Sequence, residues 1–206
     1  MPRKYEIRDP IHGFVHLNSL EREVINHPAF QRLRRIRQLA WTEMVYPGAV
    51  HTRFEHSLGV MHVASRLFQT VCRRSRELLK SEYEFDEDSR GRQEQIIRLA
   101  ALVHDIGHTP FSHGAEELLP TDPATGKQFS HEQYSAAILK YVLAETIDNH
   151  PKAESLGINA EDVKFIFTSS PRKRSSLVWK ALLSGQMDAD RMDYLLRDSH
   201  HAGVAY

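Results

Sequence analysis

His104 and Asp105 stand at the end of a strongly apolar run, residues 96–103. The run predicts a buried helix. Two polar side chains at the end of a buried helix need polar or ionic partners. The sequence offers such partners at His56, in the segment RFEHSLGV, and at Asp190, in the segment MDADRMDYLLRD. The chain is therefore expected to fold so that three segments far apart in sequence meet at one point.

The four side chains together predict a metal site. Two imidazoles and two carboxylates suit one divalent ion such as Mn, Fe, Mg, Ni or Zn. None of the four is a cysteine, which excludes a Cys-rich structural zinc site at this point. An ion with only four protein ligands keeps positions for water and substrate, as hydrolysis requires. The alternative is that these residues are unrelated members of the 13 histidines of the chain.

The strip HDIGHTPFSHGAE, residues 104–116, is too irregular for a single exposed helix face. It predicts a helix end, a tight loop and a new helix start, which together turn several polar groups toward one place. We expect His108, Glu116 and the later His131 to lie near the substrate. A histidine beside a carboxylate can exchange protons near neutral pH. The alternative for each residue is a solvent-facing side chain or a hydrogen-bonded core residue.

The Asp190 segment predicts a polar helix face. Asp190, Tyr194 and Asp198 are spaced four residues apart and so share one face, with Arg191 beside it. Such a stripe could contact a metal, phosphates and a sugar hydroxyl in turn. An ordinary charged helix surface is the alternative.

Hydrophobic periodicity predicts an all-α fold, a helical bundle with a small N-terminal β-hairpin. One domain is expected over 1–206, with the hairpin at 2–17 and the helical core at 18–206. Helical segments are expected from Asn18 to Leu39, with a new start at Pro28, over 54–80, over 96–103, from His131, over 160–167 and over 177–183. The charged stretches 82–95 and 170–176 are expected to be loops.

Composition limits the classes of partner. The chain has 206 residues, with 27 Lys and Arg against 27 Asp and Glu. The charges are balanced, so net charge gives no indication that the chain binds nucleic acid. A single cysteine, Cys72, excludes an internal disulfide framework. The sequence shows neither a secretory signal nor an apolar run of the roughly 20 residues that span a bilayer. We expect a cytoplasmic protein without a membrane partner.

Six segments together resemble the metal-dependent phosphohydrolases named for their His-Asp motif. The resemblance is closest to the branch of the deoxynucleoside triphosphate (dNTP) triphosphohydrolases, in which a sterile-alpha-motif can accompany the HD domain. The matching segments, in the family's order, are DPIHG at 9–13, FQRLRRIRQL at 30–39, YPGAVHTRFEHSLGV at 46–60, HDIGHTPFSH at 104–113, HEQ at 131–133 and MDADRMDYLLRDSHHAG at 187–203.

The resemblance implies a role for each matching residue. The implied metal ligands are His56, His104, Asp105 and Asp190, and the implied catalytic surroundings are His108, Glu116 and His131. The implied phosphate contacts are Arg53, Arg191 and Tyr194, and the implied nucleoside contacts are Gln38, Leu39 and Asp198. The implied reaction is hydrolysis of a dNTP to deoxynucleoside and triphosphate.

Two departures from the family leave alternatives open. Glu6, Arg8 and Asn26 do not match the base-reading residues of the guanine-nucleotide activator site, although Gln31 and Arg34 do. Relatives also continue with a C-terminal part that closes the pocket and builds oligomer contacts, so we expect weak activity from these 206 residues alone. The alternative functions are a nucleoside monophosphatase, a phosphodiesterase, or a non-catalytic module that binds nucleotides or nucleic acid. A homo-oligomer is compatible with each.

Overall fold

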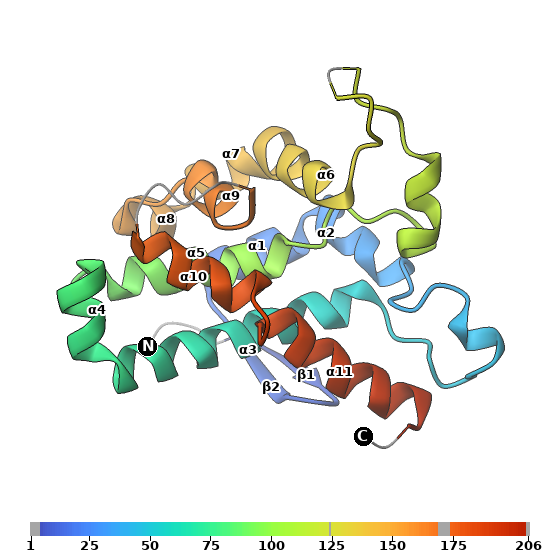
Figure 1. Cartoon of the computed structure of the whole chain (residues 1–206), viewed down its shortest axis with the longest axis horizontal. Helices are drawn as coiled ribbons and strands as arrows, with labels where there is room; N and C mark the ends of the chain where they lie inside the picture. Colours follow the sequence, from blue (N-terminus) through green and yellow to red (C-terminus); the bar gives the residue numbers. More distant parts are fainter. Residues whose placement is uncertain (1–4, 124, 169–173, 205–206) are drawn as a thin grey trace.

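The structure, a computed structural model, describes residues 5–123, 125–168 and 174–204. The described residues form a helical bundle with one two-stranded hairpin, which confirms the predicted all-α fold class (Figure 1). The helices and strands are β1 (Tyr5–Asp9), β2 (Gly13–Leu17), α1 (Ser19–Asn26), α2 (Pro28–Gln31), α3 (Arg53–Arg74), α4 (Arg76–Tyr83), α5 (Arg90–Val103), α6 (His131–Ile138), α7 (Ala144–Asp148), α8 (Pro151–Leu156), α9 (Ala160–Thr168), α10 (Arg174–Ser184) and α11 (Ala189–Ala202). Short 3₁₀ turns are η1 (Arg32–Arg35), η2 (Thr42–Met44) and η3 (Ser112–Leu118), and η4 (Leu139–Leu143) is a π-helical turn.

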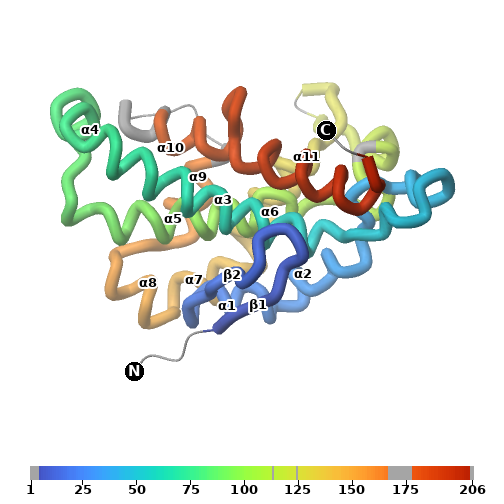
Figure 2. Tube along the Cα trace, turned by 90° about the horizontal axis from the view of Figure 1, so that it is seen from below, coloured from blue at the N-terminus to red at the C-terminus, as the bar shows by residue number. Residues whose placement is uncertain are grey.

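The N-terminal hairpin is closed by a single carboxylate. β1 and β2 pair antiparallel, with Asp9 opposite Gly13. The Asp9 Oδ1 atom accepts hydrogen bonds from the backbone N–H groups of Ile11 (2.9 Å) and His12 (2.8 Å). Gly13 then adopts a φ of 77°, a left-handed conformation that glycine tolerates without steric cost. Figure 2 shows the hairpin against α3 and close to α11.

The core is built around α3, which packs most extensively against α5 and then against α11. Leu58, Met61 and Phe68 of α3 are buried, as their spacing predicts. Val63 and Leu67, two further apolar residues of α3, are only half-buried and line a surface groove of about 500 Å³ between α3 and α11. The central helix therefore carries an outer apolar face that reaches the surface.

The helix expected over 54–80 is wrong in its length. α3 ends at Arg74 and α4 begins at Arg76, because Ser75 leaves the helical conformation with φ −120° and ψ 29°. The break turns the chain so that Leu79 becomes buried. Phe85 then meets the rings of Phe68 and Trp179, with centroid distances of 6.2 and 4.9 Å. A straight helix to residue 80 would carry these apolar groups away from the core.

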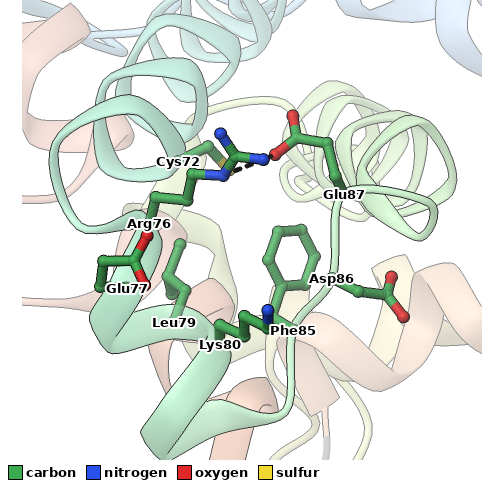
Figure 3. Close-up of a pocket in the computed structure, with 8 residues that line it drawn as sticks. All are labelled: Cys72, Arg76, Glu77, Leu79, Lys80, Phe85, Asp86 and Glu87. Atoms are coloured by element: carbon green, nitrogen blue, oxygen red, sulfur yellow. Dashed lines mark ion pairs between the residues drawn. The ribbon is translucent and has the colours of Figure 1, made fainter.

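The bend between α3 and α4 leaves a hollow of about 230 Å³, shown in Figure 3. Charged side chains face it, and Arg76 Nε lies 3.7 Å from Glu87 Oε2. Cys72 is buried at its base, and burial raises the pKa of its thiol, so the thiol stays protonated and unreactive at neutral pH. None of the predicted site residues lines this hollow.

The charged stretch 82–95 is not all loop, because α5 already begins at Arg90. Gln95 is buried and donates from Nε2 to Glu21 Oε1 at 3.0 Å. Glu21 in turn accepts from Arg98 Nε at 2.6 Å and from Nη2 at 2.8 Å. Composition alone predicts that this segment is exposed, whereas its last residue, Gln95, is buried by its contact with Glu21 of α1.

Two further expectations need correction. The helical segment predicted up to Leu39 stops at Arg35, because Arg37 forms an isolated bridge with Thr52 and the Gln38 N–H donates to His51 O at 3.1 Å. The loop expected at 170–176 lies partly outside the described residues, at 170–173, and its last residues already belong to α10. In the part of the chain that is described, no helix has the length and apolar character needed to cross a membrane.

Candidate metal centre

The first turn of α3 carries Arg53 and His56. This helix begins with a capping box, in which Glu55 Oε2 accepts the Thr52 N–H at 2.5 Å. Such reciprocal capping satisfies backbone donors that a helix start otherwise leaves unpaired. It also fixes the rotation of the first turn, so that Arg53 and His56 both point inward and are buried.

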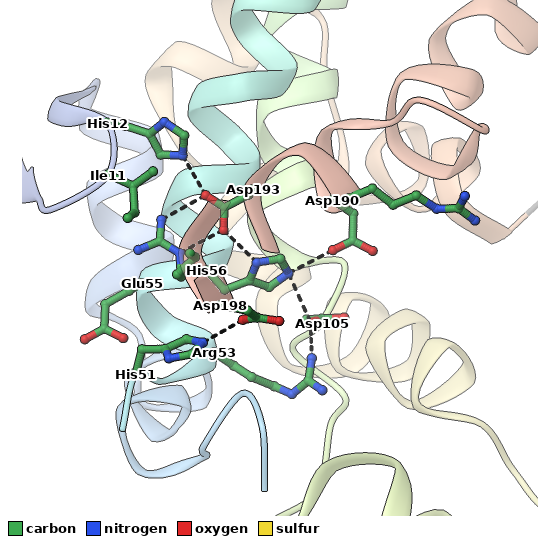
Figure 4. A network of polar contacts seen from close by, with 12 residues as sticks. Ile11, His12, His51, Arg53, Glu55, His56, Asp105, Asp190, Asp193 and Asp198 are labelled. Atoms are coloured by element: carbon green, nitrogen blue, oxygen red, sulfur yellow. Dashed lines mark hydrogen bonds and ion pairs between the residues drawn. The ribbon is translucent and has the colours of Figure 1, made fainter. Parts of the chain in front are cut away.

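The first turn of α11 carries Asp190. Its N-cap is Asp188, whose Oδ1 accepts the Arg191 N–H at 2.8 Å. Asp190 faces α3 from this turn, and Asp193, one turn further along, is completely buried. Figure 4 shows both carboxylates directed toward His56.

His104 and Asp105 lie in the turns that follow α5, and α6 holds these turns in place. The Gly107 N–H donates to Ser135 Oγ at 2.9 Å, and Ser135 Oγ donates to His104 O at 2.6 Å. A Cβ built at Gly107 would overlap backbone atoms of His131 and Ser135 on α6, so glycine is required for this close packing. The His-Asp turn is therefore a rigid support for the site.

The four predicted metal ligands lie together. Nitrogen and oxygen atoms of His56, His104 and Asp190 all fall within 4.8 Å of one another. Asp190 Oδ1 is 2.9 Å from His56 Nε2. The Asp105 carboxylate lies between the rings, with Oδ2 3.7 Å from His56 Nε2 and Oδ1 3.4 Å from His104 Nε2. Three distant segments thus deliver two imidazoles and two carboxylates to one point.

The hydrogen bonds of the two histidines show that this donor set fits a metal ion. His56 Nδ1 lies 2.8 Å from Asp193 Oδ2, and His104 Nδ1 lies 2.8 Å from the carbonyl oxygen of Ala101. An ionised carboxylate and a carbonyl only accept, so both Nδ1 atoms carry a proton. Both Nε2 atoms are buried and face carboxylate oxygens, that of His56 2.9 Å from Asp190 Oδ1 and that of His104 3.4 Å from Asp105 Oδ1. A bound ion would displace any proton from Nε2, and this atom would then donate its lone pair, the arrangement that metal-binding histidines adopt.

The charges at this point are strongly coupled. Burial opposes the ionisation of Asp105, but the nearby His104 and Arg53 outweigh it and hold the carboxyl pKa well below its usual range. The pKa of Asp190 is also lowered, because its contacts with the two histidines outweigh burial. Burial by itself lowers the pKa of His56, yet its contacts with Asp190 and Asp193 raise it to about 9. The carboxylates stay ionised, as metal ligation requires.

A second group of polar residues adjoins the first. Side-chain atoms of Asp105, His108 and His131 lie within 4.8 Å of one another, and the two imidazole rings stack at 3.9 Å. His131 Nδ1 is 2.5 Å from Glu116 Oε1. Burial, the largest influence, lowers the pKa of His108 to about 4, so His108 is neutral near pH 7. The three predicted catalytic residues therefore lie together beside Asp105.

Arg53 is tied to this centre rather than open to solvent. Its Nη1 donates to Asp105 Oδ2, and its Nη2 donates to Ser112 Oγ. Ser112 and the preceding Phe111 both have positive φ angles, 56° and 70°. Residues other than glycine rarely adopt this backbone conformation, and such backbone strain is often found at functional sites. Arg53 thus brings a positive charge to the edge of the cluster.

A cavity of about 260 Å³ opens beside the predicted ligands His104, Asp105 and Asp190. Arg191 and His131 also line it, which places two further predicted site residues at its wall. Tyr194 and Leu39 are half-buried but are not among its lining residues. Gln38 and Asp198 do not line it either, so none of the three predicted nucleoside contacts lies at the cavity wall.

Asp198 and Gln38 meet at a residue that the sequence analysis did not select. Asp198 Oδ1 is 2.8 Å from His51 Nε2, and the Gln38 N–H donates to the backbone oxygen of the same histidine. Asp193 was also missed, although it contacts His56 directly. The only sequence signal for Asp193 is its spacing of four from Arg197, which indicates a helical ion pair but not that the pair is buried.

The fold and the site define the class of this protein. The HD domain family model matches residues 53–198, and the chain belongs to the HD-domain family. An uncharacterised protein of Methanocaldococcus jannaschii is 38% identical over 200 residues, covering 97% of this chain and 34% of that protein. The deoxynucleoside triphosphate triphosphohydrolase SAMHD1 of Homo sapiens is 33% identical over 220 residues, covering 96% of this chain and 33% of that protein.

A solved structure shows the same architecture. The crystal structure of a hypothetical protein from Aquifex aeolicus matches with a TM-score of 0.74 at 34% identity, covering 99% of this chain and 48% of that one. The chain spans less than half the length of each of these three proteins. The similarity therefore covers the domain that contains the site, and only part of each relative.

Proposed function

We propose that this chain is a metal-dependent phosphohydrolase that acts on nucleotides. Within that class we propose dNTP triphosphohydrolase activity, which yields a deoxynucleoside and triphosphate. The observation that carries the proposal is the convergence of the His56 and His104 Nε2 atoms with the Asp105 and Asp190 carboxylates. Membership of the HD-domain family supports the hydrolase class, and the relatives named dNTP triphosphohydrolases support the substrate.

The four ligands would hold one divalent ion, and the mixed nitrogen and oxygen set suits Mn, Fe, Mg, Ni or Zn. When bound, such an ion polarises a phosphoryl oxygen and orients the attacking water. Arg191, at the cavity wall, would offset phosphate charge. Arg53 is held by Asp105 and Ser112 and adds a fixed positive charge at the edge of the cluster. Tyr194, Gln38, Leu39 and Asp198 remain proposed substrate contacts.

Proton transfer would fall to His131 and His108. Glu116 holds the His131 ring by its Nδ1 atom, so proton exchange with substrate would take place at Nε2 on the other side of the ring. The low pKa of His108 keeps this ring neutral, in a state that can accept a hydrogen bond. The two stacked rings would thus offer one proton-exchanging and one accepting group beside the phosphate.

Product identity tests the proposal. Elemental analysis of the purified chain should find one transition-metal ion, and a screen of dNTPs should release inorganic triphosphate. Asp105→Ala should lose the ion and the activity while keeping most of its helical circular dichroism. Release of orthophosphate from nucleoside monophosphates, or opening of cyclic nucleotides, would assign another phosphohydrolase activity to the same ligands. Tight nucleotide binding without turnover would favour a non-catalytic module.

A further inference from the structure

Asp193 is the most heavily hydrogen-bonded carboxylate at the centre, and the proposed reaction gives it no task. Its Oδ2 atom accepts from His56 Nδ1 and from Arg197 Nε, both at 2.8 Å. Its Oδ1 atom accepts from Arg197 Nη2 at 2.8 Å and from His12 Nε2 at 2.6 Å. Burial opposes the ionisation of Asp193, but these donors outweigh it and lower its pKa. The carboxylate is therefore ionised and held from several sides (Figure 4).

Two of the residues in this network belong to the N-terminal hairpin. His12 lies in the hairpin turn, and its side chain is 8% exposed. Asp9, the carboxylate that closes the turn, accepts from Arg197 Nη1 through Oδ2 at 2.9 Å. Asp9 Oδ1 also accepts the His12 N–H, so Asp9, His12, Asp193 and Arg197 form a closed ring of contacts. The hairpin is thereby fastened to the carboxylate that holds His56.

α3 and α11 pack closely at the position of this network. Gly59 of α3 lies directly against it, and a Cβ built there would overlap Asp193 Oδ1 and Arg197 Nη2. Asp193 and Arg197 are both fully buried. The Asp193 carboxylate is therefore shielded from solvent and closely confined by α3 at Gly59.

We propose that Asp193 is a positioning residue for His56, and that His12 helps to hold Asp193 so that hairpin docking and ion binding support each other. The proposal rests on the proposed metal centre. An acceptor at Nδ1 fixes the orientation and tautomer of a ligating histidine and raises the basicity of Nε2. Because coupling between two sites is reciprocal, a bound ion should also stabilise the docked hairpin.

The first test is a Zn²⁺ titration of the metal-free protein in competition with a chelator. Asp193→Asn keeps the size of the side chain but removes its charge and part of its acceptor capacity. We expect its Zn²⁺ affinity to fall by about 10–100-fold, the usual effect of changing an outer-shell partner. Glu21→Gln is the matched control, since Glu21 is an equally buried, arginine-bound carboxylate remote from the site. Its Zn²⁺ affinity should equal that of the wild type.

A spectroscopic test separates positioning from general stability. In the Zn²⁺-loaded wild type, the His56 Nδ1 proton should give a downfield NMR signal that exchanges slowly with water. Asp193→Asn should shift this signal and speed its exchange, whereas Glu21→Gln should leave it unchanged. His12→Ala should weaken Zn²⁺ binding less than Asp193→Asn does, and His12→Gln, which keeps a donor, should restore it. Zn²⁺ should also slow amide exchange in β1 and β2.

The outcomes distinguish this proposal from the proposed metal centre. If the wild type binds no Zn²⁺, or His56→Ala binds it as tightly as the wild type, the metal centre itself is wrong. If the wild type binds Zn²⁺ through His56 but Asp193→Asn keeps wild-type affinity and an unchanged Nδ1 signal, only the positioning role is wrong. Equal affinities for His12→Ala and His12→Gln would remove the hairpin from the network. If Asp193→Asn fails to fold, the comparison of His12→Ala with His12→Gln decides the proposal, since both the Zn²⁺ affinity and the His56 Nδ1 signal should change in His12→Ala and recover in His12→Gln.

Discussion

The histidines of this site differ in their chemistry because their ring nitrogens have different partners. His56 and His104 each turn Nδ1 to an acceptor in the protein interior and direct Nε2 toward the carboxylates of Asp105 and Asp190. His131 turns Nδ1 to Glu116, in a pair that is 19% and 28% exposed. The His131–Glu116 pair can exchange protons with a substrate or with water, whereas the buried Nε2 atoms of His56 and His104 face the carboxylates of the proposed metal centre.

His131→Ala should therefore lower turnover far more than it lowers metal content. Loss of a general acid or base typically reduces the rate by about 10²–10⁴-fold. The measurement is the steady-state rate of triphosphate release beside the metal-to-protein ratio of the same preparation. A variant that loses its ion together with its activity would place His131 among the ligands instead.

At the scale of helices and strands, hydrophobic spacing predicts where helices lie but not where they break. The segments after Asn18, Pro28 and His131 are helical as expected. The break at Ser75 has no local signal, because its cause is the burial of Leu79 and the contact of Phe85 with Trp179. Long-range packing of this kind cannot be read from the spacing of residues within one segment.

Replacing a helical glycine by alanine should have opposite effects on stability at two positions, because Gly59 lies at the contact between α3 and α11 and Gly91 meets no neighbouring atom. Gly59→Ala places a methyl group against Asp193 and Arg197 and should destabilise the fold by about 3–5 kcal/mol, the usual cost of breaking a buried ion pair. Gly91→Ala in α5 meets no atom within 4 Å and should stabilise by up to about 1 kcal/mol through helix propensity. Urea unfolding of both variants checks the prediction. Equal unfolding free energies for the two variants would show that α11 moves to accommodate the methyl group at position 59.

The ion pair of Glu21 on α1 with Arg98 on α5 predicts that the stability of the fold depends on pH. Burial opposes the ionisation of Glu21, but Arg98 outweighs it, so its folded pKa lies below the ordinary value of 4.5. This contribution to stability is complete above pH 4.5 and is lost as the pH falls through the folded pKa. The stability difference between the wild type and Glu21→Gln should therefore shrink on acidification.

Urea midpoints at pH 7 and near pH 3 measure that difference, the lower value lying beneath the ordinary range of glutamate pKa values. Glu161→Gln is the control, since Glu161 is 62% exposed and its pair with Lys164 should contribute little at either pH. A wild-type advantage over Glu21→Gln that stays constant with pH would contradict the assignment.

At the scale of the whole molecule, residue types indicate the metal centre, and the fold supplies its supports. Histidine and aspartate at positions 56, 104, 105 and 190 could be selected from the sequence because their chemistry is complementary. Asp193, His12 and His51 could not be, because Asp193 acts behind the ligand His56 and the two histidines contact Asp193 and Asp198 rather than the proposed ion, and residue type does not distinguish such supports. Their roles follow from the antiparallel hairpin, the close approach at Gly59 and the register of α11 against α3.

An ion at this centre would join α3, the turns after α5 and the start of α11, so it should stabilise the whole fold. At a free concentration of 100 times Kd, binding to the folded state alone contributes about 2.7 kcal/mol. For a chain of this size that corresponds to a rise in Tm of roughly 5–10 °C. Thermal unfolding of the metal-free protein across a Mn²⁺ series measures the shift. His131→Ala should keep the shift and His56→Ala should lose it, because only His56 supplies a ligand. A shift of equal size in His56→Ala would place the ion elsewhere in the molecule.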